Sequence, residues 1–385
     1  MATPKRVVHL TTVHHPYDPR IYHKECQSLK NAGFDVTLIA QTSDDDEEKY
    51  YEKPIRHIPL KKYASRLQRM TLGVYEAYKK AKYMKADVYH FHDPELLPVG
   101  WLLKNKNNVV IYDIHEDYIT SILQKDYLPE PVKKIVAALY DVLERFLTKH
   151  MELCLAEKYY IERYPIGVHI LNYPTVNERF INHERKGKTE NKLLYTGNVS
   201  LVRGAMEHAK LPTILPDIEV HFVGKCPQEL AEKMYAEAGE AKDRLKFEGI
   251  DRFVEKEVIE ERYLETNWLA GIALFPPTEH YMRKELTKFF EYMNAGLPIV
   301  CSDFPVWKKF VETYECGIAV DPNDDEAIKE AILFLQHNPE EAKRMGENGK
   351  KAVLEELNWK TEEKKLIDWY RKLLHMEKKQ EGMDR

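Results

Sequence analysis

Short apolar segments alternate with amphipathic helical patterns along almost the whole of this 385-residue chain. Each apolar segment is nearly uninterrupted, which is typical of parallel strands that helices cover on both faces. Helical patterns such as residues 21–32, closed by Gly33, and residues 132–150 separate them. The predicted strands are residues 6–13, 35–41, 55–60, 87–91, 109–114, 151–156 and 169–171 in the first half, and 192–196, 218–223, 245–248, 271–275, 298–301 and 317–320 in the second.

The repetition of this scheme predicts an α/β fold with two Rossmann-like, doubly wound parallel-sheet domains. One compact core would also be unusual for a chain of this length. The polar segment 173–191 lacks apolar periodicity and predicts the boundary, so that the domains cover residues 1–178 and 190–358. The acidic run 44–48 is expected to be an exposed loop. After Asp324 the chain is expected to be almost wholly helical.

Composition excludes several classes of protein. The formal net charge of -5 argues against a general nucleic-acid binder. No segment has the apolar length of a membrane-spanning helix, and the N-terminal residues lack the apolar core of a secretory signal. The five cysteines show no metal-type spacing, so buried, reduced thiols in a cytoplasmic protein are expected.

Polar residues gather directly after the predicted strands. Ligands of open parallel sheets bind outside the carboxyl ends of the strands, so two such rims are expected to line a cleft between the domains. One wall would carry His, Asp and Arg and the other Gly, Arg, Lys and Glu, which suggests an acceptor on the first domain and an anionic donor on the second. The clusters are residues 14–20, 90–95 and 113–117, followed by 197–204, 224–227 and 276–288.

The segment 287–300 predicts a short helix that stops at Gly296 before a buried strand. Lys288 and Glu291 fall on one face of this helix. One interpretation is an ordinary surface ion pair, and the frequency of such pairs favours it. In the other, Lys288 is a cation that binds a phosphate, and Glu291 is a carboxylate that binds sugar hydroxyls. Their place beyond a strand end favours the second interpretation.

The loop from Gly197 to Gly204 enters a helical pattern with Arg203 near its start. Backbone N–H groups and an arginine suit an anion there. The loop matches neither a Walker loop nor a G-x-G-x-x-G fingerprint, and a plain strand-to-helix turn is the alternative.

Two histidine-rich loops follow strands in the first half. His115 is either a hydrogen-bond donor to a reacting sugar or phosphate, or a member of a satisfied polar cluster. His90, His92 and Asp93 raise the alternative of a metal site, but their spacing is not that of a known metal motif. No metal site is therefore predicted.

The segment from Lys61 to Lys85 contains eight basic residues and a single acidic one, Glu76. It is either an ordinary surface helix or a helix that also docks on an anionic membrane leaflet. The two interpretations are compatible, since one face can pack while the other docks.

In their order along the chain, these motifs resemble the family 4 glycosyltransferases, which have the GT-B fold. The resemblance covers nearly the whole chain and implies a retaining transferase without a metal or other cofactor. It also implies that a helix at residues 361–380 packs back on the first domain. The motifs are residues 15–20 (HPYDPR), 92–97 (HDPELL), 112–116 (YDIHE), 195–198 (YTGN) with Arg203-Gly204, and 287–300.

The resemblance implies a nucleotide-sugar donor and a glycan or lipid-linked acceptor of the cell envelope, on the cytoplasmic side of the plasma membrane. Glu291 matches the carboxylate that holds the ribose, and His115 a histidine near the donor sugar. Arg203 and Lys288 match basic residues at the diphosphate, where fixed cations stabilise the departing group. The implied donor-binding residues also include Gly197, Asn198 and Thr287, and the acceptor-side candidates are His15, Asp18, Arg20 and Asp93.

Two positions depart from the family pattern. Arg283 stands where many members carry a glutamate, and Asn198 stands where an arginine is common. The identity of the donor sugar is therefore not specified. A nucleotide-sugar epimerase of the same fold and a non-catalytic sugar-nucleotide-binding protein remain as alternatives to the transferase.

Overall fold

A computed structural model describes residues 3–42, 55–116, 118–123, 129–183, 185 and 187–376. The predicted acidic loop at 44–48 and the last residues of the predicted helix 361–380 lie outside these ranges. The chain divides into two compact units, each considered by itself. Unit 1 comprises Met1–Asn172 and Trp359–Arg385, and unit 2 comprises Tyr173–Asn358. The polar segment predicted to separate the domains thus belongs to unit 2.

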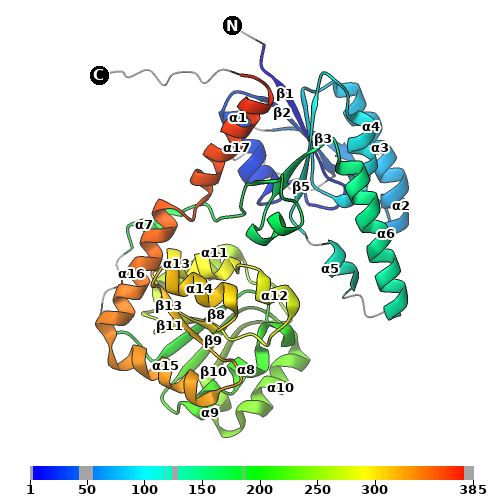
Figure 1. The fold of residues 1–385 in the computed structure, drawn as a ribbon. Helices are drawn as coiled ribbons and strands as arrows, with labels where there is room; N and C mark the ends of the chain where they lie inside the picture. The colour runs from blue at the N-terminus through cyan, green and yellow to red at the C-terminus, as the bar shows by residue number, and fades with distance from the viewer. Residues whose placement is uncertain are drawn as a thin grey trace, which may run out of the picture. The chain divides into compact units, whose positions relative to one another are not determined.

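Unit 1 is built on a parallel sheet of seven strands in the order β3-β2-β1-β4-β5-β6-β7 (Figure 1). Every pair of neighbouring strands is parallel. The sheet reverses its winding between β1 and β4, which is the switch point of a doubly wound fold. The strands are β1 (Arg6–Leu10), β2 (Asp35–Gln41), β3 (Arg56–Leu60), β4 (Val88–Phe91), β5 (Val109–Ile114), β6 (Glu152–Leu155) and β7 (Val168–His169).

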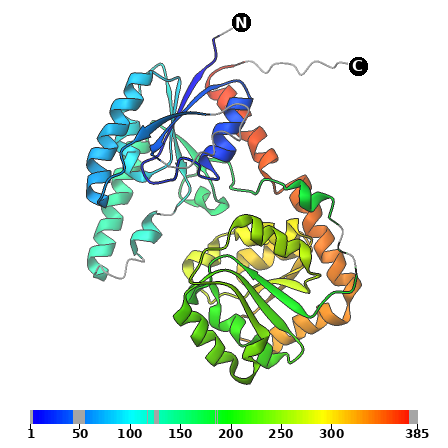
Figure 2. The same cartoon turned by 180° about the vertical axis from the view of Figure 1, so that it is seen from behind.

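Helices cover both faces of this sheet, and a separate apolar cluster fills each face. One cluster includes residues of α3, α4 and α6, and the other includes residues of η1, α1 and α17. Figure 2 shows unit 1 from behind. The helices are η1 (Ile21–Cys26), α1 (Gln27–Asn31), α2 (Arg66–Gln68), η3 (Arg69–Gly73), α3 (Val74–Met84), η4 (Pro94–Leu96), α4 (Leu97–Leu103), α5 (Tyr118–Leu123), α6 (Glu130–Thr148), η5 (Lys158–Glu162) and α17 (Trp359–Leu373).

Unit 2 repeats the architecture with six parallel strands in the order β10-β9-β8-β11-β12-β13. Its switch point lies between β8 and β11. Because the order again begins 3-2-1-4, both units are Rossmann-like, as the alternating pattern predicted. The strands are β8 (Lys192–Thr196), β9 (Glu219–Cys226), β10 (Leu245–Ile250), β11 (Ala270–Ala273), β12 (Ile299–Ser302) and β13 (Gly317–Val320).

The end of unit 2 is almost wholly helical, as predicted from the sequence after Asp324. The helices of the unit are α7 (Glu178–Ile181), η6 (Leu201–Arg203), α8 (Ala205–Ala209), α9 (Leu211–Ile214), α10 (Gln228–Ala238), η7 (Gly239–Arg244), α11 (Lys256–Glu265), α12 (Glu279–Arg283), α13 (Thr287–Asn294), α14 (Pro305–Thr313), α15 (Asp325–His337) and α16 (Pro339–Glu355). No described helix combines the length and apolarity needed to cross a bilayer.

Candidate functional site

The switch point of unit 1 carries a small cavity of about 30 Å³. Its lining comes from the loops that follow β1, β4 and β5, and it includes His14, Asp93 and His115. Asp93 and His115 were predicted from the sequence. His14 was not, although it directly precedes the predicted His15. His15 itself is exposed, and its Nδ1 accepts a hydrogen bond from the backbone N–H of Tyr17 at 3.2 Å.

Asp93 is buried and forms a pair with His14, whose Nδ1 lies 2.9 Å from Asp93 Oδ1. The backbone N–H of Thr12 and the hydroxyl of Thr11 donate to Asp93 Oδ2 at 2.6 and 2.9 Å. Burial raises the pKa of Asp93, but His14 and these donors outweigh it, so the pKa is lowered. Burial lowers the pKa of His14, but Asp93 outweighs it, so that pKa is raised.

The His14–Asp93 pair therefore predicts a pH-dependent effect of His14→Gln on stability. Because the pKa of His14 is raised on folding, its contribution to stability is fully present below the pKa of the unfolded state. That contribution is lost as the pH rises through the pKa of the folded state. Because the pKa of Asp93 is lowered on folding, its contribution to stability is fully present above the pKa of the unfolded state. That contribution is lost as the pH falls through the pKa of the folded state. The pair thus contributes fully from about pH 4 to about pH 6.5, by about 1–2 kcal/mol.

The thermal midpoint of His14→Gln should consequently lie further below that of the wild type at about pH 5.5 than at about pH 9. Paired thermal melts at both values measure this. His150→Gln is the matched control, since His150 is an exposed histidine of the same unit. An equal deficit for His14→Gln at both values would contradict an ionised pair.

Arg20 and Asp113 form a buried ion pair behind the cavity. Arg20 Nε donates to Asp113 Oδ2 at 2.9 Å, and Arg20 Nη2 donates to Asp113 Oδ1 at 2.8 Å. Arg20 Nη2 also donates to the carbonyl of Ile170 at 3.0 Å. Burial raises the pKa of Asp113, but Arg20 and His115 hold it well below its usual value. This placement gives Arg20, an acceptor-side candidate from the sequence, a structural role inside unit 1.

Asp18, another acceptor-side candidate, caps the chain where η1 begins. Its Oδ1 accepts hydrogen bonds from the backbone N–H groups of Arg20 at 2.8 Å and Ile21 at 2.9 Å. The carboxylate thereby satisfies N–H groups that have no partner at a helix start. A contact between Asp18 and an acceptor stays a prediction.

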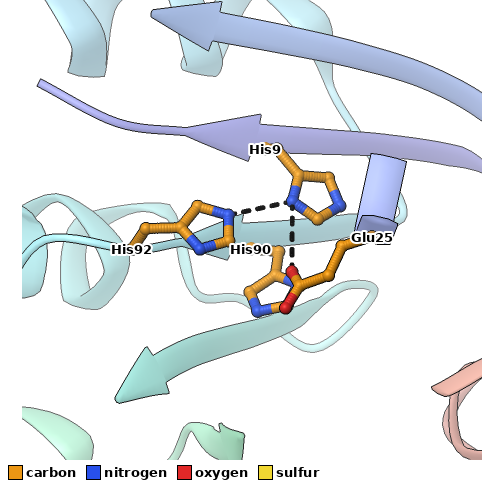
Figure 3. A group of neighbouring side chains, drawn as sticks. All are labelled: His9, Glu25, His90 and His92. Carbon is orange, nitrogen blue, oxygen red and sulfur yellow. Dashed lines mark hydrogen bonds and ion pairs between the residues drawn. The ribbon is translucent and has the colours of Figure 1, made fainter. Parts of the chain in front are cut away.

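Three histidines and Glu25 form a buried cluster beside this ion pair (Figure 3). His92 Nδ1 lies 3.0 Å from Asp113 Oδ2, and His92 Nε2 lies 3.0 Å from His9 Nδ1. Since Asp113 only accepts, His92 donates through Nδ1 and accepts from His9 through Nε2. Burial lowers the pKa of His92 to about 3, so it is neutral. The ion pair thereby fixes the tautomers of both rings.

The same cluster has the composition of a metal site, because potential ligand atoms of His9, Glu25, His90 and His92 lie within 4.8 Å of one another. Other contacts account for part of this arrangement, while His9 Nε2, His90 Nε2 and both carboxylate oxygens of Glu25 are buried without a hydrogen-bond partner among the described residues. His90 Nδ1 lies 2.7 Å from the hydroxyl of Tyr370, and Glu25 Oε1 lies 3.1 Å from Arg20 Nε. Asp93, the third ligand considered from the sequence, is held by His14 and threonines.

His115 lies at the edge of the cavity with 13% of its side chain exposed. Its Nε2 donates to the carbonyl of His92 at 2.9 Å, and its Nδ1 lies 3.2 Å from Asp113 Oδ2. Burial lowers the pKa of His115, against the opposing effect of Asp113. The ring is thus fixed by a polar cluster and still presents an edge to the cavity. This agrees with the structural interpretation of His115, while a hydrogen bond from His115 to a reacting sugar or phosphate stays a prediction.

In unit 2 the predicted loop from Gly197 to Gly204 follows β8 at the switch point. Gly204 has φ +77°, and a Cβ there would lie 1.8 Å from the carbonyl oxygen of Leu274, so only glycine fits. The loop contains the short helix η6, and α8 after it has only five residues. The loop therefore offers an anion no long helix start, and anion binding by its backbone N–H groups and Arg203 stays a prediction.

Arg203 reaches from this loop to the segment after β11. Its Nε donates to the hydroxyl of Tyr281 at 2.9 Å, and its Nη1 donates to the carbonyl of Asn198 at 3.4 Å. That carbonyl also accepts from the hydroxyl of Tyr195 at 2.9 Å. Tyr281, which has no distinguishing signal in the sequence, thus holds Arg203 near Asn198.

The predicted helix of the segment 287–300 is α13, which ends before Gly296 at φ +68°. Thr287 is exposed at its start. Lys288 Nζ lies 3.4 Å from the centroid of the Tyr195 ring and 5.0 Å from that of Phe275. This nitrogen is buried and has no hydrogen-bond partner among the described residues. Burial and then the charge of Arg203 hold the pKa of Lys288 well below its usual value.

Glu291 does not satisfy this lysine by a hydrogen bond. Its Oε2 accepts from the hydroxyl of Tyr263 at 3.1 Å, and Tyr263 in turn bonds Thr196 Oγ1 at 2.8 Å. Burial raises the pKa of Glu291. Lys288 and Glu291 are therefore not the ordinary surface ion pair that their spacing allows. The structure gathers Arg203, Asn198 and Lys288 around Tyr195, with Glu291 one turn further along α13.

Comparison with known proteins gives a family for part of the chain. Residues 176–352, which lie within unit 2, match the family described as glycosyl transferases group 1. A search of curated protein sequences finds no match.

Solved structures resemble the whole chain. Sucrose-phosphate synthase from Thermosynechococcus elongatus has a TM-score of 0.72 at 17% identity, over 97% of this chain and 100% of that one. A glycosyltransferase from Rickettsia africae ESF-5 has a TM-score of 0.72 at 14% identity, over 97% and 99%. Anabaena Alr3699/HepE in complex with UDP has a TM-score of 0.69 at 11% identity, over 96% and 100%. The likeness shows the GT-B fold, while assignment to family 4 stays a prediction.

Proposed function

We propose that this chain is a retaining glycosyltransferase that moves a hexose from a nucleoside-diphosphate sugar to a cell-envelope polysaccharide or lipid-linked acceptor. The observation that carries the proposal is the buried side-chain nitrogen of Lys288, which has no hydrogen-bond partner among the described residues and lies near Arg203. A buried cation is costly unless an anion joins it. The match of residues 176–352 to the group 1 glycosyl transferases supports this assignment.

The proposed chemistry assigns the two cations to the leaving group. As the bond from the anomeric carbon to the diphosphate breaks, negative charge develops on the departing oxygen. Lys288 and Arg203 stabilise that charge without a metal. The proton of the acceptor hydroxyl passes to the leaving phosphate as the new glycosidic bond forms. Glu291 accepts hydrogen bonds from the ribose hydroxyls.

A UDP-linked donor is the first candidate. The related HepE structures are complexes with UDP, with UDP and glucose, and with UDP-glucose. The sequence resemblance is the basis for proposing family 4 membership and transfer with retained anomeric configuration. It is also the basis for the roles of His115 and the acceptor-side residues. A cytoplasmic location is part of the same proposal, supported by five cysteines that are all free and buried.

Calorimetric titration with UDP, GDP and ADP, followed by product analysis, tests the function. We expect one nucleotide to bind and its sugar conjugate to transfer a hexose only when an acceptor is present. Conversion of the donor alone would indicate an epimerase, and binding without turnover on any envelope acceptor would indicate a non-catalytic protein. Binding of none of the three nucleotides would overturn the proposal.

Nucleotide binding is further expected to take up protons. The diphosphate raises the low pKa of Lys288, so between the free and bound values the lysine gains a proton on binding. At about pH 8 the phosphate itself is fully ionised. At any pH between the free and the bound pKa of Lys288, titrations of UDP in Tris and in HEPES should therefore differ in apparent enthalpy by an amount set by the ionisation enthalpies of the two buffers.

Lys288→Arg is the control for this proton uptake, because a guanidinium stays charged throughout. This variant should bind UDP with equal apparent enthalpy in the two buffers, once protons exchanged by groups other than residue 288 are accounted for. If the wild type already shows no dependence on the buffer, Lys288 is charged before the nucleotide arrives.

A further inference from the structure

Helix α6 turns an apolar face outward. Its large apolar residues recur at intervals of three and four residues, which places them on one side of a helix. Five of them are between 51% and 68% exposed: Ile135, Leu139, Val142, Leu143 and Phe146. Its opposite side is packed on unit 1, where Ala137 and Leu147 are buried. A face of this kind is unusual for a helix on the surface of a soluble domain.

The neighbouring helices α3 and α4 lie with α6 in one layer over the same face of the sheet. All three contribute to a single apolar cluster, and Figures 1 and 2 show them side by side. Their outward sides therefore form one surface with that of α6. This surface, here called the outer layer, also exposes apolar residues of α2, η3, α3 and α4: Leu67, Leu72, Tyr75, Tyr83, Trp101 and Leu102. The aromatic residues are of the kind that gather at membrane interfaces.

The part of the outer layer that the segment 61–85 forms is also basic. This segment has eight basic residues and one acidic residue, Glu76. Glu76 accepts a hydrogen bond from Lys80 at 2.7 Å. Beside it lies a groove of about 650 Å³. Leu72, Tyr75 and Tyr83 contribute to its apolar lining, and Lys61 and Lys79 are among its basic residues. A groove lined by both apolar side chains and ammonium groups suits an acyl chain with its phosphate headgroup.

We propose that the outer layer docks on the anionic leaflet of a phospholipid bilayer. The exposed side chains of α6, α4 and α3 enter the acyl boundary, while the lysines hold lipid phosphates. A second copy of this chain is the rival occupant, since the stripe on α6 has the spacing of a helix pair. The basic segment favours the membrane, because two copies of it would repel each other. This inference does not depend on the proposed enzymatic activity.

Co-sedimentation of the full chain with vesicles tests the docking. Vesicles of phosphatidylcholine and phosphatidylglycerol should bind the wild type, and vesicles of phosphatidylcholine alone should bind it less. The double variant Leu139→Gln, Phe146→Gln should weaken binding at least about tenfold, because each change removes apolar area from the inserted face. Lys62→Gln and Lys79→Gln should each weaken it about fivefold at low salt, and much less at high salt.

The matched control is Ile166→Gln with Phe334→Gln, which removes two exposed apolar side chains elsewhere on the chain. This control should bind vesicles like the wild type. Absence of wild-type binding to the anionic vesicles would overturn the proposal. So would equal binding of Leu139→Gln, Phe146→Gln and the wild type. A dimer by light scattering that this variant dissociates, without vesicle binding, would assign the face to a second copy.

Discussion

Replacing Lys288 by methionine is expected to lower kcat for sugar transfer by about 10²–10³-fold. The side-chain nitrogen of Lys288 is buried over Tyr195 and has no hydrogen-bond partner among the described residues, so it is placed to pair with an anion as a cation. Methionine has a similar length and suits the aromatic surroundings. The same variant should therefore unfold at an equal or higher temperature than the wild type, since a buried amino group without a hydrogen-bond partner costs free energy in either protonation state.

Steady-state transfer assays and thermal melts measure the two effects together. Lys308→Met, at an exposed position of unit 2, is the matched control and should change neither kcat nor the melting temperature. Glu291→Gln should mainly weaken binding of the donor, because Glu291 is assigned to the ribose. Unchanged turnover in both Lys288→Met and Glu291→Gln would contradict the assignment of these residues to the donor site.

Arg20→Met is expected to destabilise unit 1 by about 3–5 kcal/mol. Arg20 is buried, and its loss leaves Asp113 and Glu25 in the interior without their cation. The histidines are also affected, because Asp113 orients His92 and contacts His115. A matched surface change, Arg145→Met, removes an exposed ion pair with Asp141 and should cost at most about 1 kcal/mol.

Hydrogen exchange of peptides from β1, β4 and β5 reports the stability of unit 1 separately from that of unit 2. In a double-mutant cycle, Arg20→Met with Asp113→Asn should lose less than the sum of the two single changes, since the second removes the orphaned charge. Additive losses would show that Arg20 and Asp113 do not stabilise each other.

The fold followed from local patterns in the sequence. Nearly uninterrupted apolar segments such as residues 35–41 are typical of strands buried on both faces, and each of the thirteen predicted strands has a counterpart in one of the two sheets. The helix of residues 287–294 was also predictable, because Gly296 ends it in the left-handed conformation that glycine adopts most easily. The candidate site was predicted by the rule that ligands of parallel sheets bind at the loops after strand ends.

The roles of individual charges were less predictable. Arg20 was predicted as an acceptor-side residue because it lies in a polar loop, yet the loop turns it into the core, where Asp113 arrives from β5. His14 was overlooked beside His15, since alternation along a loop does not show which ring meets Asp93. Periodicity predicted a helix near residues 132–150, but did not reveal that its apolar face points outward.

The sequence by itself therefore determined the two parallel sheets and the loops that carry the polar residues, because strand burial and glycine turns depend on neighbours along the chain. Only the tertiary structure decided which charges are paired. Lys288 and Glu291 are three residues apart in either case. It is Tyr195 from β8 and Tyr263 from α11 that separate them, and these residues meet α13 only when the sheet is assembled.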